Sequence, residues 1–209
     1  MINILKKCYL WAFVKNLSWI FQVFPFICLL NFSYFCPFKW IDIMEKNGDP
    51  KLYALLNDLE IEYEYYEHPA APTIEEAIKY WKDLDATHCK NLFFRNHKGN
   101  RHYLVILDHK QDLNIHDLEQ RLKQGKLTFA SPKRMMKYLG IEPGSVSPLA
   151  LIYDKDRHVH LFLDENLKNS KTISFHPCIN TASLVIKYDD FMKFLKHLGN
   201  SWEYVRMYD

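Results

Sequence analysis

Apolar residues recur at helical spacing in several stretches of the chain. Leu52, Leu55, Leu56 and Leu59 lie three or four residues apart, as the inner face of an amphipathic helix requires. Thr73 and Glu76 have the spacing of a capping box, which predicts the start of a second helix. Capping and helix-ending residues bound the other helices. We therefore expect helices over residues 50–59, 73–83, 114–123, 131–140 and 189–198.

Apolar and β-branched runs between these helices, bounded by Gly, Pro and Asn, predict strands. We expect them at residues 61–66, 89–95, 101–108, 126–129, 149–153, 158–163, 171–175 and 181–187. The five-residue loop 96–100 makes the second and third a hairpin, and the turn 154–157 pairs the fifth with the sixth. Residues from Trp202 onward are expected to form a tail. This order predicts an α+β domain with a mixed, mostly antiparallel, curled sheet and surrounding helices.

Residues 1–43 differ in composition from the rest of the chain. They hold 12 of the 32 aromatic residues and one acid, Asp42, whereas residues 44–209 carry 23 Lys and Arg against 24 Asp and Glu. We therefore divide the chain into a hydrophobic extension, 1–43, and one domain, 44–209, which is large enough to bury a core.

Three interpretations of the extension compete. Residues 16–36 have the length of a membrane span, but polar residues and Pro25 interrupt them. A signal peptide would need a small-residue cleavage pattern, which is missing here. We favour the third interpretation, in which the extension is untranslated and synthesis starts at Met44, just before a polar stretch and an amphipathic helix. A membrane is expected as a partner only if residues 1–43 are an anchor.

The cysteine and histidine patterns bear on compartment and metal binding. Three of the five cysteines lie in the extension, and Cys89 and Cys178 have no paired spacing, which favours a reducing, cytoplasmic location. His158 and His160 would share one strand face as a pair of metal ligands, but no third ligand accompanies them. We expect neither a metal nor a cofactor.

Candidate chemistry gathers at two stiffened corners. In residues 174–180, Ser-Phe-His-Pro-Cys-Ile-Asn, Pro177 stiffens a connection between two expected strands that carries His176 and Asn180. In residues 144–148, Gly-Ser-Val-Ser-Pro, Gly144 permits a close approach of the backbone to a ligand. Polar residues held at strand ends are common in binding sites, so the two corners are expected to face one pocket.

Together with Lys90 and Asn91, which precede the apolar stretch Leu92–Arg95, these corners resemble the YbaK/prolyl-tRNA synthetase-associated editing domain. The resemblance runs from about Asp49 to about Gly199 and is strongest to the free-standing branch that acts on alanyl-tRNA(Pro). It implies that Lys90 is required for deacylation and holds the 3′-terminal nucleotide.

The resemblance also implies roles for the two corners. His176 shapes the aminoacyl pocket and orders the substrate, and the Gly144 backbone borders the amino-acid side chain. Asn91, Ser145 and Asn180 are expected to bind substrate. We therefore count Lys90 and His176 as catalytic.

The residues alone leave other interpretations open. Lys90 can instead be a surface lysine whose aliphatic side chain packs on the edge of the sheet while its ammonium stays in water. His176 can equally be a core histidine. Cys178 has no activating base nearby, so we interpret it as a packing residue. The serines form no triad or nucleophile elbow, so covalent catalysis is unsupported. An aminoacyl ester is already activated, so a positioned water and oxyanion-binding backbone N–H groups suffice for hydrolysis.

RNA binding must depend on local patches, because residues 44–209 have no net positive charge. Lys133, Arg134 and Lys137 would form a basic edge on one helix, although such a cluster is more commonly a solvated face. If these residues contact RNA phosphates, binding weakens with salt.

The expected function is therefore trans-editing hydrolysis of mischarged tRNA(Pro), with alanyl-tRNA(Pro) as substrate and prolyl-tRNA synthetase as a further partner; no DNA is expected. One alternative is a cysteinyl-tRNA(Pro) deacylase, but that branch more often has a doubled glycine where this chain has Pro143-Gly144. A second alternative is a non-catalytic module that binds tRNA or a synthetase.

Overall fold

The computed structural model describes residues 46–71, 74–81, 84–112 and 114–208. The interpretations of residues 1–43 and of the Thr73 capping box lie outside these ranges. Within them, no helix has both the length and the hydropathy needed to cross a membrane.

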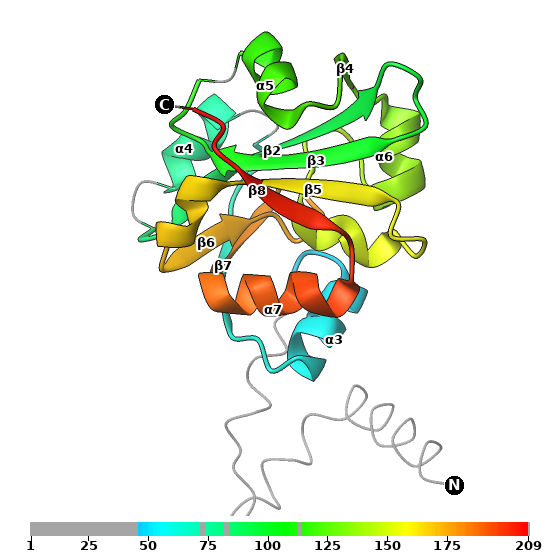
Figure 1. Ribbon diagram of the computed structural model, residues 1–209. Helices are drawn as coiled ribbons and strands as arrows, with labels where there is room; N and C mark the ends of the chain where they lie inside the picture. The colour runs from blue at the N-terminus through cyan, green and yellow to red at the C-terminus, as the bar shows by residue number, and fades with distance from the viewer. Residues whose placement is uncertain (1–45, 72–73, 82–83, 113, 209) are drawn as a thin grey trace, which may run out of the picture. The chain divides into compact units, whose positions relative to one another are not determined.

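An eight-stranded mixed sheet carries the domain (Figure 1). Four of the strand pairings are antiparallel, namely β1·β7, β2·β3, β2·β4 and β6·β7, and three are parallel, namely β2·β6, β3·β5 and β5·β8. This confirms the expected α+β fold with a mixed sheet. The path of strands is β1 (Tyr63–Glu67), β7 (Ala182–Lys187), β6 (Thr172–Phe175), β2 (Thr87–Asn96), β3 (His102–Asp108), β5 (Val159–Asp164) and β8 (Trp202–Val205), with β4 (Leu127–Phe129) beside β2.

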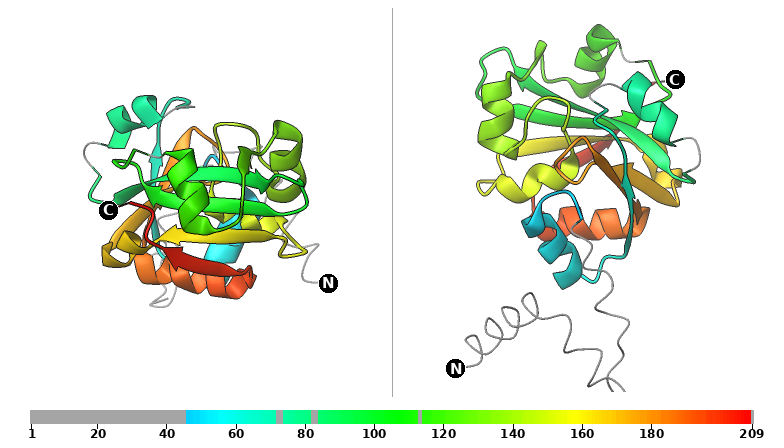
Figure 2. Two further views of the ribbon diagram at one scale, coloured as in Figure 1. Left: turned by 45° about the horizontal axis from the view of Figure 1, so that its top comes forward. Right: turned by 180° about the vertical axis from the view of Figure 1, so that it is seen from behind.

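Helices cover both faces of this sheet (Figures 1 and 2). On one face lie α3 (Pro50–Asp58), α6 (Pro132–Leu139) and α7 (Tyr188–Leu198), together with the 3-10 helix η2 (Pro148–Tyr153); α5 (Ile115–Leu122) covers the other face. Two shorter elements, α4 (Ile74–Trp81) and the 3-10 helix η3 (Glu165–Asn169), complete the described set.

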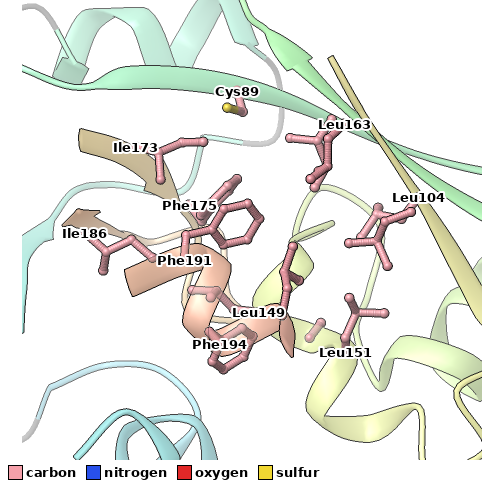
Figure 3. Close-up of a cluster of buried hydrophobic side chains, with 14 of the residues drawn as sticks. Cys89, Leu104, Leu149, Leu151, Leu163, Ile173, Phe175, Ile186, Phe191 and Phe194 are labelled. Carbon is pink, nitrogen blue, oxygen red and sulfur yellow. The ribbon is translucent and has the colours of Figure 1, made fainter. Parts of the chain in front are cut away.

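The central strand β3 shows why both faces need cover. Its residues 102–107 are all buried, with Leu104 and Ile106 facing the α7 side and Tyr103, Val105 and Leu107 facing α5. A continuous apolar run is typical of a strand covered on both faces. In the larger core, Phe191 and Phe194 of α7 reach Phe175 of β6 and Leu149 of η2 (Figure 3).

The expected strand 149–153 is wrong, because these residues form η2. Ser147 caps this helix by accepting a hydrogen bond from the Leu149 N–H at 3.2 Å, and Pro148 occupies its first turn. A short, fully buried apolar run does not distinguish a strand from a buried helix by periodicity. The predicted pairing of 149–153 with 158–163 fails with it, and β5 pairs instead with β3 and β8.

The expected tail is also wrong, because Trp202–Val205 forms β8 at the end of the sheet. The last helix, expected over 189–198, begins one residue earlier, at Tyr188, with Lys187 at its N-cap position. The helix expected over 114–123 ends at the left-handed residue Lys123. Lys90 and Asn91 lie inside β2, as the expected strand 89–95 has them.

Two buried histidines should make the fold sensitive to mild acid. Arg134 donates to Nε2 of His102 at 2.8 Å, so Nδ1 of His102 carries the proton and donates to Nε2 of His158 at 2.8 Å. Burial, His158 and Arg134 lower the pKa of His102 to about 4, and burial and His109 lower the pKa of His88 to about 4. Both side chains therefore stay neutral in the folded protein at pH values where the unfolded chain takes up protons.

We expect the free energy of unfolding to fall as pH drops below about 6.5, the unfolded pKa, and to keep falling until about pH 4. Each histidine accounts for about 2 kcal/mol between pH 7 and pH 5. Urea unfolding at pH 7, 6 and 5 measures this slope. The variant His102→Gln, which cannot gain a charge, should lose about half of it; an unchanged slope in this variant would contradict the assignment.

Candidate functional site

The site lies where the sheet is interrupted along one edge of β2. On that edge, residues 87–88 pair with β6 and residues 94–96 pair with β4. No described strand pairs with residues 89–93 there. A cavity of about 330 Å³ occupies this gap, and its walls are Ala71, Ala77, Trp81, Cys89, Lys90, Asn91, Leu92, Gly144, Val146 and His176. The structure thus brings together Lys90, Asn91, Gly144 and His176 from three distant segments.

A second depression of about 690 Å³ lies nearby, lined among others by Asn47, Glu67, His68 and Thr181. Glu67 places a carboxylate there, which would repel a phosphate, and none of the described residues that line it is a Lys or Arg. We therefore take the 330 Å³ cavity as the candidate site.

Lys90 offers a positive charge to the cavity. Its side chain is half-buried, and Nζ donates to the carbonyl oxygen of Gln111 at 2.5 Å. No described carboxylate pairs with it. An ammonium has three N–H donors, so two remain for a ligand. Lys90 can therefore hold a phosphate or a carbonyl oxygen at the cavity.

His176 presents a neutral ring to the same space. Its Nδ1 donates to the carbonyl oxygen of Ala182 at 2.8 Å, which leaves Nε2 as an acceptor in the neutral tautomer. Burial lowers the pKa of His176, so the ring is neutral at pH 7. Nε2 has no hydrogen-bond partner among the described residues. His176 can accept a hydrogen bond from a substrate ammonium or a water.

Asn91 ties the two sides of the cavity together. Its Nδ2 donates to the carbonyl oxygen of Val146 at 3.2 Å, which fixes the 144–148 corner against β2. Gly144 in that corner has φ of +85°, a conformation that non-glycine residues rarely adopt. The corner that the sequence singled out therefore depends on Gly144 for its shape and on Asn91 for its position.

The backbone of Asn91 also faces the gap. The carbonyl of His88 accepts a hydrogen bond from the His109 N–H, just after β3, on one edge of β2. The carbonyl of Phe93 accepts one from the Ala130 N–H on the opposite edge. Because backbone groups alternate between the two sides of a strand, the N–H and carbonyl of Asn91 point away from β3, toward the interruption. A backbone donor is therefore directed at the cavity.

Two predicted substrate-binding residues do not line the cavity. Ser145 is buried, and its backbone N–H donates to Glu142 in a turn. The carbonyl of Asn180 accepts from the Ala71 N–H at 3.1 Å, which holds the segment before α4 against the 176–181 connection. Both residues support the cavity walls, and direct contact with substrate stays a prediction.

Sequence reasoning missed Trp81, Ala77 and His68. Trp81 closes one wall and stacks on His88, with ring centroids 4.5 Å apart. Ala77 and Trp81 are four residues apart in a predicted helix, so helical spacing could have placed them on one face. His68 lies with its ring 5.9 Å from that of His176 and bonds Ser183 and Pro69; no local pattern marked it.

Two of the three residues of the predicted basic edge are exposed to solvent, and the third is bonded within the protein. Lys133 and Lys137 are exposed, but Arg134 donates to the carbonyl oxygen of Gly99 and to His102, both at 2.8 Å. Arg134 thus has a structural role in holding the β2–β3 turn. Its contact with RNA remains a prediction.

Among the described residues, no group of three or more His, Cys, Asp or Glu side chains is arranged to hold a metal ion. The two histidines considered as a metal pair have protein partners: His158 bonds His102, and His160 contacts Ser201 and Glu203.

Cys178 should be dispensable for activity. It does not line the cavity, and burial together with Asp49 raises the pKa of its thiol to about 12, so the nucleophilic thiolate is scarce at pH 7. Cys178→Ala should keep at least about half of the wild-type hydrolysis rate, because the substitution removes no group that contacts the substrate. A twofold loss of rate corresponds to only about 0.4 kcal/mol in the activation free energy. A covalent aminoacyl adduct on Cys178, seen by mass spectrometry during turnover, would contradict this.

Comparison with known proteins places these residues in a family. A family model described as the aminoacyl-tRNA editing domain matches residues 68–194, which include every residue of the cavity wall. A prolyl-tRNA editing protein from Acetoanaerobium sticklandii is 34% identical over 164 residues, covering 78% of this chain and all of the relative. Prolyl-tRNA synthetase associated domain-containing protein 1 from Bos taurus is 34% identical over 146 residues, covering 68% of this chain and 85% of the relative.

Solved structures agree at the level of the fold. A candidate trans-editing enzyme for prolyl tRNA synthetase aligns with a TM-score of 0.54 and 21% identity, over 75% of this chain and 97% of that one. The resemblance found in the sequence is thereby confirmed. The chain belongs to the aminoacyl-tRNA editing domain family.

Proposed function

We propose that this protein is a trans-editing aminoacyl-tRNA deacylase that hydrolyses mischarged tRNA(Pro) in the cytoplasm, with alanyl-tRNA(Pro) as its substrate. The single observation that carries the proposal is the cavity in which Lys90, Gly144 and His176 meet. The names of the relatives from A. sticklandii and B. taurus point the same way.

The cavity provides three functions that ester hydrolysis requires. The Lys90 ammonium attracts the 3′-terminal phosphate or polarises the ester carbonyl. The neutral His176 ring accepts a hydrogen bond from the α-ammonium group and so orients the amino acid. The backbone N–H of Asn91, directed at the gap, is a candidate donor to the oxyanion that forms when water attacks the carbonyl carbon.

The reaction needs no protein nucleophile. Water adds to the carbonyl carbon, the oxyanion collapses, and the bond to the ribose oxygen breaks, giving a free amino acid and a tRNA with its hydroxyl restored. The proton lost by the attacking water is returned to the leaving ribose oxygen, and the vicinal ribose hydroxyl is well placed to relay it. Positioning and electrostatics are sufficient because the ester is already activated.

A size filter explains why such an enzyme is needed. A synthetase site built for proline discriminates against a smaller amino acid by only about 1 to 3 kcal/mol per missing methylene, so a second site must remove the error. The Gly144 corner limits the volume available to the amino-acid side chain. We expect the part of the cavity beside Gly144 to admit the alanine methyl group and to exclude the proline ring.

The test is a deacylation panel with the full chain and tRNA(Pro) charged with alanine, cysteine, serine or proline. We expect alanine to be released fastest and prolyl-tRNA to be spared. Faster release of cysteine would favour the cysteinyl-tRNA(Pro) alternative, which the Pro143-Gly144 corner disfavours. Binding of tRNA or prolyl-tRNA synthetase without release of any amino acid would favour the non-catalytic module.

A further inference from the structure

A groove of about 440 Å³ lies between the β2–β3 turn and the connection from α5 to β4. Lys98 and Arg101 line it from the turn, and Lys123 and Lys126 line it from the connection. All four side chains are exposed, and none of them makes an ion pair with a described residue. In the part of the chain that the structure describes, no Asp or Glu lines the groove. This nearly neutral domain therefore concentrates positive charge at one place.

The turn that carries two of these cations is held in shape. Oδ1 of Asn96 accepts from the backbone N–H groups of Asn100 and Arg101 at 3.1 and 3.2 Å. Arg95 donates to the carbonyl of His97, and Arg134 donates to that of Gly99. A preorganised turn loses little conformational freedom when a ligand binds.

The opposite wall is tied to the sheet. The hydroxyl of Tyr103 in β3 donates to Oε1 of Gln124 at 3.0 Å. Gln124 lies between Lys123 and Lys126, so the two cationic walls keep a fixed separation. The groove is thus a built feature rather than a set of independent surface lysines.

The groove and the candidate active site lie along the same strand. Side chains alternate along β2, so Lys90, Leu92, Phe94 and Asn96 share one face, and Lys90 and Asn96 are about 20 Å apart at 3.3 Å per residue. Lys90 lines the cavity and Asn96 lines the groove. Between them, Phe129 of β4 pairs with Phe94, stacks on it at 4.5 Å, and is 50% exposed.

We propose that the groove binds backbone phosphates of the tRNA acceptor stem, and that Phe129 stacks a base of the single-stranded 3′ end on its way to the cavity. The inference rests on the proposed function and adds to it the path of the RNA. Each strand of a duplex carries one phosphate per nucleotide, so a groove with four cations meets several at once. Positive grooves combined with exposed aromatic rings are typical of single-strand binding.

This path revises the predicted RNA surface. The groove residues carry the main contact, while Lys133 and Lys137 extend it along α6. Arg134 contributes indirectly, because its hydrogen bond to the carbonyl oxygen of Gly99 holds the β2–β3 turn in place.

The test compares two triple variants of the full chain. Lys98→Gln, Lys123→Gln and Lys126→Gln together remove three charges from the groove. Lys155→Gln, Lys171→Gln and Lys196→Gln remove three exposed charges that do not line it. The probe is an uncharged acceptor-stem hairpin RNA with a single-stranded CCA end, and its binding is followed by fluorescence anisotropy between 50 and 200 mM salt.

We expect the groove variant to bind the hairpin at least about tenfold more weakly at low salt, and its slope of log K against log salt to be smaller by about 2 to 3. The control variant should stay within about twofold of the wild type. Phe129→Ala should weaken binding by about tenfold through the lost stacking, with no change in the salt slope. Wild-type affinity and slope in the groove variant would overturn the proposal.

A second substrate separates this result from the proposed function. The groove variant should hydrolyse the alanyl ester of a short CCA oligonucleotide as fast as the wild type, and should show a raised KM only for full-length alanyl-tRNA(Pro). If the wild type binds the hairpin through the groove but hydrolyses neither ester, the deacylase proposal fails and the RNA site stands. If the groove variant loses hydrolysis of the short ester as well, the groove acts on the fold or the cavity and the proposal is wrong.

Discussion

Lys90→Ala should reduce kcat/KM for mischarged tRNA(Pro) by about 10- to 150-fold, since a hydrogen bond to a charged group contributes about 1.5 to 3 kcal/mol and each 1.36 kcal/mol is tenfold in rate. The lost ammonium lines the cavity. The side chain makes one described hydrogen bond, to Gln111. Its removal opens no hole in either apolar core, so the free energy of unfolding should change by only about 1 kcal/mol.

The matched control for this experiment is Lys110→Ala. Lys110 lies nearby after the end of β3 but is exposed and does not line the cavity. It should retain nearly full activity, with any change confined to the salt dependence. Equal losses in both variants would mean that Lys90 contributes only to the general field around the cavity, and unchanged turnover in Lys90→Ala would remove it from the catalytic set.

Gly144→Ala should have the second largest effect, a loss of at least about tenfold in hydrolysis of the alanyl ester. The new methyl group would be added to the wall of the cavity. It would also be placed on a residue with φ of +85°, where a non-glycine residue costs about 1 to 2 kcal/mol. Crowding and strain therefore act in the same direction.

A glycyl ester separates crowding from strain, because glycine has no side chain to meet the new methyl group. We expect Gly144→Ala to hydrolyse the glycyl ester with a smaller loss than the alanyl ester. Gly199→Ala is a control for strain outside the cavity: φ is +74° there, and the three heavy atoms nearest to an added Cβ belong to the Arg157 side chain, at 3.0 to 3.3 Å. A uniform loss for both esters in Gly144→Ala would show that the corner does not set the size filter.

The sequence revealed much of this site because several of its residues lie in short local motifs. Pro177 and Pro148 mark rigid corners, because proline restricts φ in any context. The strands on either side of residues 174–180 can be located from their apolar and β-branched residues. The hairpin of β2 and β3 followed from the five-residue loop with Gly99. These features depend on neighbours in the sequence, and the structure has the hairpin and the strands on either side of residues 174–180, although a 3-10 helix and not a strand begins at Pro148.

What sequence could not supply were features that depend on distant partners. The apolar pattern of residues 149–153 predicts a strand, but the cap from Ser147 and the burial of residues 148–151 against the sheet favour a 3-10 helix. Trp202–Val205 has too little pattern of its own and becomes a strand only because β5 offers an edge. The cationic groove joins residues 98–101 with residues 123–126, and neither stretch stands out alone.

The interruption beside β2 has a consequence for exchange of backbone hydrogens with solvent. Lys90 and Leu92 direct their amides at β3, whereas Asn91 between them directs its amide at the gap. In the middle of a buried strand, amide exchange is usually slow because it needs a large opening of the structure. Asn91 should instead exchange its hydrogen for deuterium far faster than either neighbour, and an oxyanion analogue seated in the cavity should slow it again.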